Sequence, residues 1–509
     1  MNYILAHDLG TTGDKATLFD SQGQACASSF FGYETRYPQP NWAEQDPQDW
    51  WWAVCLTTRE LLAASDIPMG AVAGISFSGQ MQGCVLVDRQ CHPLRSAIIW
   101  ADTRAVDEAR RLVEQVGMQP AYHIMGHRLS ASYSAAKLLW VRNHQPQIFK
   151  ETYKVLQAKD FIVARLTGRF VTDYSDASCT NLYDLQARNW SPELLAAAGL
   201  EPGRLPELHA STDVVGEVGP GAAGEIGLLA GTPVVVGGGD GACAAAGAGV
   251  VEEGSAYNYL GSSAWIGLAT RQPVYDPQMR TLTLAALQPD RYCPLGVMQA
   301  AGGSYQWLRD TFCLPEKEAS ARQGVSAYEL MDHLAMQSLP GAGGLLFLPY
   351  LLGERSPRWN ENARGVFFGL SMSHGRAQIV RAVLEGITYN LRVILEAFRQ
   401  QGVEIPAMRV IGGGAKSAVW RQMMADIYGL PVQAPALLAE ATSFGAALAG
   451  GIGVGLYKNF DLARELTPVA ATALPDPSLK PGYDRMYALF NRAYETFAPL
   501  YDEIGESKD

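Results

Sequence analysis

The chain opens with short apolar runs separated by small polar turns. Residues 3–7 and 16–20 have the composition of buried strands, and the loop DLGTTGDK joins them. A turn at SQG (21–23) leads into QACASSFF (24–31), which has the composition of a third strand. The pattern predicts an antiparallel meander with a glycine-rich loop at its first bend.

A second hairpin of the same design occurs in the second half of the chain. Residues 256–270 read AYNYLGSSAWIGLAT, in which two strand-like runs flank LGSS. The matching loop residues are Gly10, Thr11 and Thr12 in the first hairpin and Gly261, Ser262 and Ser263 in the second. The repeat predicts a duplicated domain with a boundary near residue 247, which divides the chain into residues 1–247 and 248–509.

Both loops have the chemistry of a phosphate-binding turn. A tight glycine turn exposes successive backbone N–H groups, and flanking hydroxyl groups add further donors. Two such loops that face each other would bind a polyphosphate from both sides. A chance match stays open, because glycine followed by two hydroxyl residues is a common turn composition.

A second glycine-rich segment places an acid after a buried strand. In TPVVVGGGDGACAAAGAG (232–249), the β-branched run predicts a strand that ends at GGG, and Asp240 follows where a helix of small residues begins. Asp is also a favoured helix N-cap, and that interpretation stays open. Three preceding glycines exceed what a cap requires and allow other groups to approach the backbone closely.

A third glycine cluster again lies between a strand and a helix. In MRVIGGGAKSAVWRQMMADIYG, the strand MRVI precedes Gly412–Gly414, and a helix begins near Ser417. A nucleotide could lie over these glycines, although a plain strand-to-helix turn has the same composition. The preceding segment predicts a helix of about 25 residues, with a core-facing stripe of Val380, Val383, Leu384, Ile387, Leu391, Ile394 and Phe398.

Composition limits the class of protein. A chain of 509 residues exceeds one ordinary core, so two large domains are expected, and 48% hydrophobic residues indicate a globular protein. The net charge of −11 favours a small substrate over nucleic acid. The N-terminus lacks the pattern of a signal peptide, and the apolar window around Asp240 carries this acid and many glycines. We therefore expect a cytoplasmic protein without a membrane span.

Other motifs predict no site. The eight cysteines show no CxxC spacing and are expected to be reduced and mostly buried. GPGAAG (219–224) fits a dinucleotide motif poorly, because proline interrupts it. SAAK (134–137) fits the SxxK of acyl enzymes, yet no KTG follows, and Lys137 precedes a helical pattern. No Gly-Lys dipeptide occurs, which excludes a P-loop.

Several motifs in order resemble the FGGY family of carbohydrate kinases. They are DLGTTGDK, GGGD, LGSS, GVFFGLSMSHGRAQIVRAVLEG and IGGGAKSAVWRQMMADIYG. WAEQDPQDWW, GQMQG and WADTR resemble the xylulokinase branch of this family. The resemblance implies an α/β fold of two duplicated actin-like (ribonuclease H-like) domains with a deep interdomain cleft, with sugar binding in the first domain and nucleotide binding in the second.

The resemblance also implies roles for individual residues. Asp240 would be the general base, and Asp8 would help to place the Mg²⁺ that bridges the phosphates of ATP. The residues implied to bind ATP are Gly10, Thr11, Thr12, Lys15, Gly261, Ser262, Ser263, Gly412, Gly413, Gly414, Lys416 and Ser417. The residues implied to face the sugar are Gln80, Met81, Gln82, Trp100, Asp102, Asp240 and Gly241.

Two departures from the family pattern concern the sugar. Familiar xylulokinases read GQMHG and GGGDN, whereas this chain has Gln82 and Gly241 at the differing positions. D-xylulose is the expected substrate, with D-ribulose or a pentitol next. An actin-like or chaperone-like ATPase, a catalytically silent sugar sensor and an acyl enzyme remain as alternatives. The expected partners are a small sugar and ATP, with no nucleic acid or membrane, and a homodimer is left open.

Overall fold

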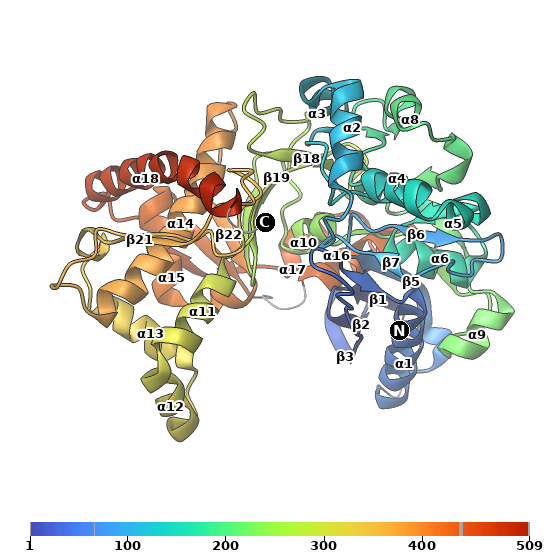
Figure 1. The fold of residues 1–509 in the computed structure, drawn as a ribbon. Coiled ribbons are helices and arrows are strands. Elements are labelled where there is room, and N and C mark those ends of the chain that lie inside the picture. The colour runs from blue at the N-terminus through green and yellow to red at the C-terminus, as the bar shows by residue number, and fades with distance from the viewer. Residues whose placement is uncertain (1, 66, 437–440, 507–509) are drawn as a thin grey trace.

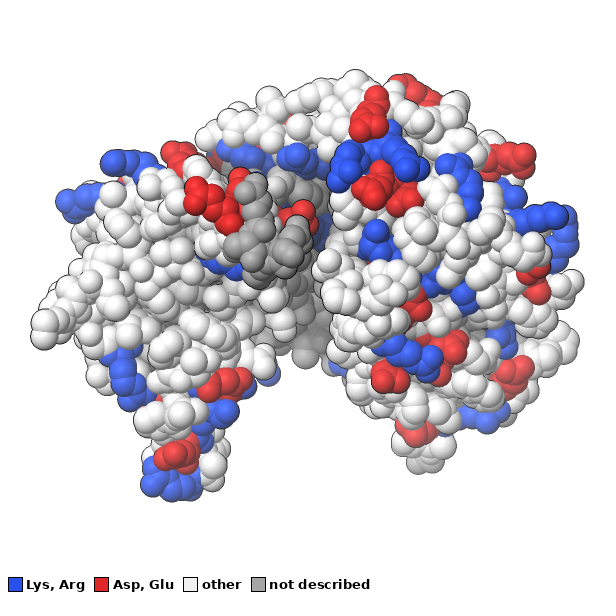
Figure 2. All heavy atoms as spheres, viewed as in Figure 1, with Lys and Arg blue, Asp and Glu red and all other residues white. Residues whose placement is uncertain are grey.

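The computed structural model describes residues 2–65, 67–436 and 441–506. Within these ranges the chain forms two lobes, each built on a seven-stranded sheet (Figure 1). On the face drawn in Figure 2, the lower halves of the lobes are separated by an open groove, and Lys and Arg are interspersed with Asp and Glu. No described helix is both long enough and apolar enough to span a bilayer.

The first sheet has the strand order β13-β14-β5-β1-β2-β3. A seventh short strand, β15, pairs with the end of β5, further along β5 than the pairing with β14. Its strands are β1 (Tyr3–Leu9), β2 (Gly13–Phe19), β3 (Ala25–Gly32), β5 (Val72–Gly79), β13 (Val214–Glu217), β14 (Pro233–Val235) and β15 (Gly238–Gly239). The shorter paired strands are β4 (Glu44–Gln45) with β7 (Ala97–Ile98), β6 (Val85–Val87) with β8 (Lys154–Leu156), β9 (Val171–Asp173) with β12 (Glu207–His209), and β10 (Tyr183–Asp184) with β11 (Asn189–Trp190).

The helices of the first half surround this sheet and form an additional cap (Figure 1). They are α1 (Pro47–Ala64), α2 (Val106–Val116), α3 (Met118–Met125), α4 (Ser134–His144), α5 (Pro146–Glu151), α6 (Ala158–Thr167), α7 (Tyr174–Ala177), α8 (Pro192–Ala198), α9 (Pro220–Ile226) and α10 (Asp240–Gly247). Short 3₁₀ turns lie at η1 (Met69–Ala71) and η2 (Pro202–Arg204).

The second sheet has the order β18-β19-β17-β16-β22-β23-β24. Its strands are β16 (Ala256–Leu260), β17 (Ala264–Leu268), β18 (Leu282–Ala285), β19 (Tyr292–Met298), β22 (Met408–Ile411), β23 (Val432–Pro435) and β24 (Val469–Ala473), and β20 (Leu346–Leu348) pairs separately with β21 (Val366–Phe368). The helices are α11 (Gly302–Phe312), α12 (Leu314–Gln323), α13 (Ala327–Met336), η3 (Ala342–Gly344), α14 (Arg376–Gln400), η4 (Gly413–Lys416), α15 (Ala418–Tyr428), α16 (Ala441–Gly453), α17 (Leu462–Leu466) and α18 (Lys480–Glu506).

The two sheets repeat one topology. In the first, β1 and β2 pair antiparallel, β2 and β3 pair antiparallel, and β1, β5 and β14 run parallel. In the second, β16, β17 and β19 form the same antiparallel series, while β16, β22 and β23 run parallel. The duplication expected from the two hairpins is therefore confirmed.

The observed strands of the first hairpin are longer than the sequence pattern predicted. Asp8 and Leu9 belong to β1, because they pair with β2 on one side and with β5 on the other. The predicted loop is thus reduced to residues 10–12. This extension places the glycine turn directly at the end of two paired strands.

The long helix predicted from its apolar stripe is α14, and the stripe is buried in the second core. The predicted helix start near Ser417 is also confirmed, because Ser417 Oγ accepts a 2.9 Å hydrogen bond from Trp420 N at the start of α15. SAAK begins α4, and GPGAAG enters α9. The cysteines are free, and Cys26 is the exposed one.

The two halves of the chain are tied together where α10 and α16 cross (Figure 1). A Cβ on Gly247 would lie 1.7 Å from Ala441 O, and a Cβ on Gly445 would lie 2.0 Å from Cys243 O. Glycine at both positions allows the two backbones to touch. Helix α16 also packs on β1 and β5, so a late segment of the chain supports the first sheet.

Candidate active site

Three neighbouring strands bring two carboxylates to one edge of the first sheet. Asp8 on β1 lies opposite Ser78 on β5, and Ser78 lies opposite Gly238 on β15. Asp240 follows two residues later as the first residue of α10. Neighbouring strands are about 4.8 Å apart, so one intervening strand separates the two backbones by about 10 Å. The register therefore brings Asp8 and Asp240 together from distant parts of the sequence.

The glycine run before Asp240 is required by close packing. Gly237 has φ of +71°, and a Cβ there would lie 1.9 Å from Phe77 O. A Cβ on Gly239 would lie 2.4 Å from Met81 Cε. These glycines allow β5 and the loop after it to approach the strand that carries the acid, as the sequence predicted.

Burial raises the pKa of both carboxylates, and the charge of Asp240 adds to the rise at Asp8. Burial raises the pKa of Asp8 to about 7, and the negative charge of Asp240 adds to this rise. Burial also raises the pKa of Asp240 to about 6, while a 2.7 Å hydrogen bond from Gly241 N favours its charged form. A carboxylate with a pKa near neutrality suits proton transfer from an alcohol.

The loop after β1 presents a hydroxyl-rich turn at the same edge. Gly10 N donates to Gly13 O over 3.0 Å, which closes the turn. Thr11 Oγ1 accepts a 2.9 Å hydrogen bond from Trp100 Nε1, and Thr12 is exposed. The turn is held from one side by the WADTR segment.

Asp14 and Lys15, the second and third residues of β2, face opposite sides of the sheet. Lys15 lies opposite Asp8 in the strand pair, and its charge lowers the pKa of Asp8. Asp14 is fully buried, where it accepts a 2.6 Å hydrogen bond from Thr57 Oγ1 and lies 2.9 Å from His7 Nδ1. Lys15 therefore lies beside Asp8 on the same face of the sheet, whereas Asp14 anchors the hairpin to α1.

The GQMQG segment forms the loop after β5, and we name residues 80–83 the acceptor loop. Gln80 is buried; its Nε2 donates to Gln45 Oε1 over 2.8 Å, and its Oε1 has no hydrogen-bond partner among the described residues. Gln82 is partly exposed, has φ of +64° and makes a side-chain hydrogen bond with the Cys179 thiol. The loop thus carries two amide side chains, and the contact of Met81 with Gly239 places it next to the segment that carries Asp240.

Asp102 lies behind this region rather than on its surface. Its side chain is fully buried, accepts a 2.6 Å hydrogen bond from Ala43 N and pairs with Arg104 Nη2 at 2.6 Å. With both carboxylate oxygens bound internally, Asp102 supports the WADTR turn and is not positioned to contact a sugar, contrary to the expectation from the sequence. Trp100 is partly exposed and reaches Thr11.

Gly241 leaves space beside the acceptor loop. A Cβ at this position would lie 3.9 Å from Leu295 Cδ1 and from Met81 Sδ, which is ordinary van der Waals contact. The backbone of Gly241 is outside the left-handed region. The fold therefore accepts a Cβ here without a clash, and glycine leaves that space next to Asp240 free.

A cavity of about 720 Å³ lies in the second lobe, within the range of about 300–1,000 Å³ that is typical of small-molecule sites. Six residues predicted to bind the nucleotide line it: Gly261, Ser262, Gly413, Gly414, Lys416 and Ser417. Gly412 and Ser263 flank these residues in the same loops. The two glycine loops of the second lobe are thus brought to one cavity.

Other walls of this cavity were missed by the sequence analysis. Tyr305 on α11 donates to Asp332 Oδ1 on α13 over 3.1 Å, and both residues line the cavity. A Cβ on Gly302 would lie 2.3 Å from Gly261 O, so α11 begins in contact with the LGSS loop. The Gly302–Gly303 pair in AAGGSYQW was the available signal for this approach.

Tyr259 connects the acids to the cavity. Burial raises the pKa of its hydroxyl, and the charges of Asp240 and Asp8 add to the rise. Its ring covers Gly261, where a Cβ would lie 2.6 Å from Tyr259 Cε1. Tyr259 therefore lies within the field of both acids and packs on Gly261, which lines the cavity of the second lobe.

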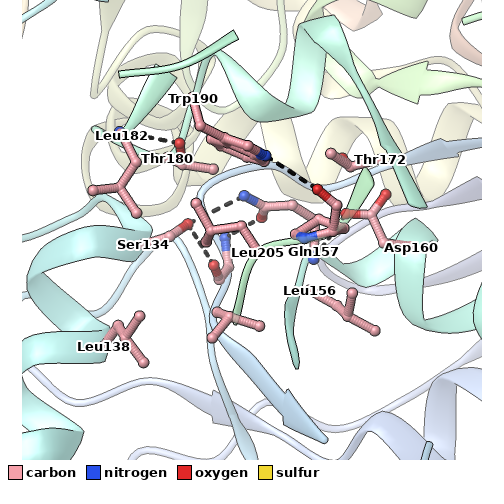
Figure 3. Close-up of a pocket in the computed structure, with 13 residues that line it drawn as sticks. Ser134, Leu138, Leu156, Gln157, Asp160, Thr172, Thr180, Leu182, Trp190 and Leu205 are labelled. Carbon is pink, nitrogen blue, oxygen red and sulfur yellow. Dashed lines mark hydrogen bonds between the residues drawn. The ribbon is translucent and has the colours of Figure 1, made fainter. Parts of the chain in front are cut away.

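A much smaller cavity lies inside the first lobe (Figure 3). Its volume of about 20 Å³ is enough for about one water molecule and too small for a sugar. Ser134, Gln157, Asp160 and Thr172 line it, together with Gly83 of the acceptor loop. This cavity lies behind the acceptor loop and is part of its support.

The described residues contain no cluster of three or more His, Cys, Asp or Glu placed to hold a metal ion. Magnesium commonly keeps several waters and binds substrate phosphates through only one or two protein carboxylates. Asp8 fits this demand, because burial and then the charge of Asp240 raise the pKa of Asp8, and a bound cation would favour its charged form.

Comparisons with known proteins agree with this geometry. Residues 3–247 match the N-terminal domain of the FGGY family of carbohydrate kinases, and residues 256–454 match its C-terminal domain. The chain is 33% identical over 501 residues to the xylulose kinase of Bacillus subtilis (strain 168), covering 97% of each chain. It is 31% identical over 506 residues to the gluconokinase of the same strain, covering 98% of each chain.

A solved structure supports the same assignment. The xylulose kinase from Rhodospirillum rubrum matches with a TM-score of 0.90 and 30% identity, covering 98% of this chain and 100% of that chain. The two duplicated α/β domains have the expected actin-like (ribonuclease H-like) fold. The chain belongs to the FGGY family of carbohydrate kinases.

Proposed function

We propose that the protein uses ATP to phosphorylate the terminal C5 hydroxyl of D-xylulose, giving D-xylulose 5-phosphate. The observation that carries the proposal is the pair Asp8 and Asp240, which lie at one sheet edge beside the acceptor loop. Two perturbed carboxylates next to a hydroxyl-rich turn suit phosphoryl transfer from a nucleotide to an alcohol.

Asp240 is the general base of this reaction. It accepts the proton of the C5 hydroxyl as that oxygen attacks the γ-phosphorus of ATP. The bond between the γ-phosphorus and the β–γ bridging oxygen breaks, and ADP leaves. A pKa of about 6 keeps Asp240 mostly charged at neutral pH and more basic than an exposed aspartate.

The phosphates of ATP bind between the two hairpin loops. Gly10, Thr11, Thr12 and Lys15 contribute from the first lobe, and Gly261, Ser262 and Ser263 contribute from the second. Gly412, Gly413, Gly414, Lys416 and Ser417 bind the nucleoside part, for which the cavity of about 720 Å³ offers the space. Residues 1–247 form the sugar-binding domain and residues 248–509 the nucleotide-binding domain in this proposal.

Mg²⁺ is the expected metal, and Asp8 would hold it together with the phosphates. When bound, the ion neutralises charge on the phosphates as it develops. Lys15, opposite Asp8, provides a fixed positive charge on the same face. A cytoplasmic location and a homodimer remain predictions.

The sugar binds at the acceptor loop. In this proposal the residues that face the sugar beside Asp240 are Gln80, Met81, Gln82, Trp100 and Gly241. Asp102 is buried and would support them from behind. Gln82 offers an amide donor and acceptor where related sequences offer a histidine ring. The names of two relatives, both xylulose kinases, favour D-xylulose over D-ribulose or a pentitol.

Gluconate is the second candidate. A gluconokinase is nearly as similar to the chain as the xylulose kinases are. Arg355 adds a specific reason, because its positive charge acts on Cys179, the hydrogen-bond partner of Gln82, and on Tyr133. A cation near the acceptor loop suits a carboxylate substrate.

The test is ADP release by the purified enzyme with MgATP and a panel of D-xylulose, D-ribulose, L-ribulose, xylitol, glycerol and D-gluconate. The proposal expects the highest kcat/KM with D-xylulose. A tenfold preference for another acceptor would overturn the assignment of D-xylulose as the substrate and leave the kinase activity unaffected. Equal ADP release without any acceptor would instead favour an actin-like or chaperone-like ATPase.

A further inference from the structure

The SAAK segment, which the proposed chemistry does not use, holds the acceptor loop from behind. Lys137 lies in the first turns of α4 and is fully buried. Its Nζ donates to Gln82 O at 2.8 Å, Ile99 O at 2.8 Å and Ser132 O at 2.5 Å. One ammonium group therefore joins three chain segments, including the acceptor loop and the start of the WADTR turn.

Ser134 reaches the next residue of the same loop. It lies three residues before Lys137, on the same face of the helix. Ser134 Oγ donates to Gly83 O over 2.6 Å and accepts from Gln157 Nε2 over 3.1 Å, and Gln157 Oε1 accepts from Gly83 N over 2.7 Å (Figure 3). Both backbone groups of Gly83 are therefore bound by side chains.

The acceptor loop needs such support, because Gln82 has φ of +64°. The left-handed conformation is unfavourable for residues other than glycine. Loss of the contacts to Gln82 O and Gly83 O would release the loop toward more common backbone angles. The Gln82 side chain would then no longer be held beside the Cys179 thiol.

This geometry also excludes the acyl-enzyme alternative for SAAK. Ser134 is buried, and its hydroxyl proton is directed to Gly83 O. The Lys137 ammonium donates to backbone carbonyl groups, so it is not placed as a base for Ser134. The S-x-x-K spacing therefore has a different use in this chain.

We propose that Ser134 and Lys137 are positioning residues that set the acceptor loop for sugar binding. Lys137 holds the carbonyl group of Gln82 in place. Because it also binds Ile99 O, it ties the acceptor loop to the start of the WADTR turn. Ser134 fixes Gly83. The inference rests on the proposed function, because it takes the acceptor loop as the sugar site. Neither side chain contacts the nucleotide cavity of the second lobe, so the effect should be confined to the sugar.

The test compares Ser134→Ala and Lys137→Met with the wild-type enzyme, using D-xylulose and MgATP. Ser134→Ala should raise the KM for D-xylulose about tenfold, because it leaves a buried carbonyl without its donor. Lys137→Met should lower kcat/KM for D-xylulose by about 100-fold or more, since three carbonyl groups lose their partner. In both variants the KM for ATP should stay near the wild-type value.

Lys154→Met is the matched control, because Lys154 Nζ also donates to a backbone carbonyl in this lobe, Leu205 O at 2.6 Å, outside the acceptor loop. It should leave the KM for D-xylulose unchanged. If Lys137→Met does not fold, the sugar KM of Ser134→Ala alone decides whether these residues position the acceptor loop.

A folded Ser134→Ala enzyme with an unchanged sugar KM, or with equal rises in the KM for sugar and ATP, would overturn the inference and leave the kinase proposal intact. A wild-type enzyme that phosphorylates no sugar in the panel would overturn both.

Discussion

In the first hairpin, the residue two positions before the loop glycine is Asp8, and its cross-strand partner is Lys15. In the second hairpin the same position holds Tyr259, and its partner is Trp265. The two aromatic rings stack with centroids 4.0 Å apart and planes at 15°. Duplicated strands thus carry a charged pair in one lobe and an apolar platform in the other.

The difference explains how one topology serves two tasks. A second carboxylate at the position of Tyr259 would add negative charge near Asp8 and Asp240, where burial and the charge of Asp240 already raise the pKa of Asp8. The aromatic ring instead covers Gly261 at the rim of the nucleotide-sized cavity. The first lobe therefore concentrates the ionisable chemistry, and the second provides shape and backbone donors.

The largest expected effect comes from removing the base. Asp240→Asn should lower kcat by about 10²–10⁴, because a positioned general base contributes this much. Binding of ATP should persist, since the cavity of the second lobe is untouched. Steady-state kinetics and a direct ATP titration measure the two quantities. Near-normal turnover in this variant would show that Asp240 is not the base.

The next largest effect compares the matching residues of the two hairpins, Asp8 and Tyr259. Asp8→Asn should lower kcat by about 10²–10³, as removal of one electrostatic contact in an active site commonly does. Tyr259→Phe keeps the stacked platform and should change kcat far less. Equal losses in both variants would contradict the division of tasks between the hairpins.

Asp8→Asn should also make the metal-free protein more stable at pH 8. A carboxyl group with a folded pKa raised from 3.8 to about 7 favours the folded state below pH 3.8, and this contribution is lost as the pH rises through about 7. Asparagine removes the cost of burying the charge at high pH. The Tm should rise by about 2–4 °C for each kcal/mol gained in a domain of this size. A lower Tm at pH 8 would contradict this account.

A smaller effect tests the contact between α11 and the LGSS loop. Gly302→Ala adds a Cβ that would lie 2.3 Å from Gly261 O, so the loop must move. The KM for ATP should rise by about tenfold, the consequence of about 1.4 kcal/mol, while the KM for D-xylulose stays nearly constant. Gly482→Ala on α18 meets no atom within 4 Å and is the control. An unchanged KM for ATP would show that the contact between Gly302 and Gly261 does not affect nucleotide binding.

The sugar site should respond to restoring the family residues. Gly241→Asn adds a Cβ that would make only ordinary van der Waals contacts, and Gln82→His replaces an amide by an imidazole in the acceptor loop. The double variant should raise the preference for D-xylulose over D-gluconate by about tenfold or more, since lost or gained hydroxyl contacts discriminate strongly. The ratio of kcat/KM values measures it. A shift toward gluconate would contradict the assigned roles.

Features set by local sequence could be predicted. The hairpins, the glycine run before Asp240, helix α14 and the Ser417 cap each depend on periodicity or on turn chemistry within a few residues. Glycine at 237 and 239 was predicted to allow close approach, and the distances to Phe77 and Met81 explain why.

Features set by pairing between distant segments could not be predicted. The placement of Asp8 next to Asp240 depends on β5 lying between β1 and β15, which no local pattern specifies. Asp102 was expected to face the sugar because of its motif, but its pairing with Arg104 turns it inward. Lys137 has the sequence context of an ordinary helix, and its three carbonyl partners come from three separate loops.

The pH dependence of kcat/KM for D-xylulose tests the central claim most directly. The measurement is made at saturating MgATP, where the cation would keep Asp8 charged. If Asp240 is the base, the wild-type value should then fall with unit slope below a midpoint of about pH 6, because protonation of this carboxylate removes the proton acceptor. In Asp240→Asn the small residual activity should lose this acidic limb. An acidic limb of the same midpoint in Asp240→Asn, or none in the wild type between pH 5 and 7, would contradict the assignment of the base.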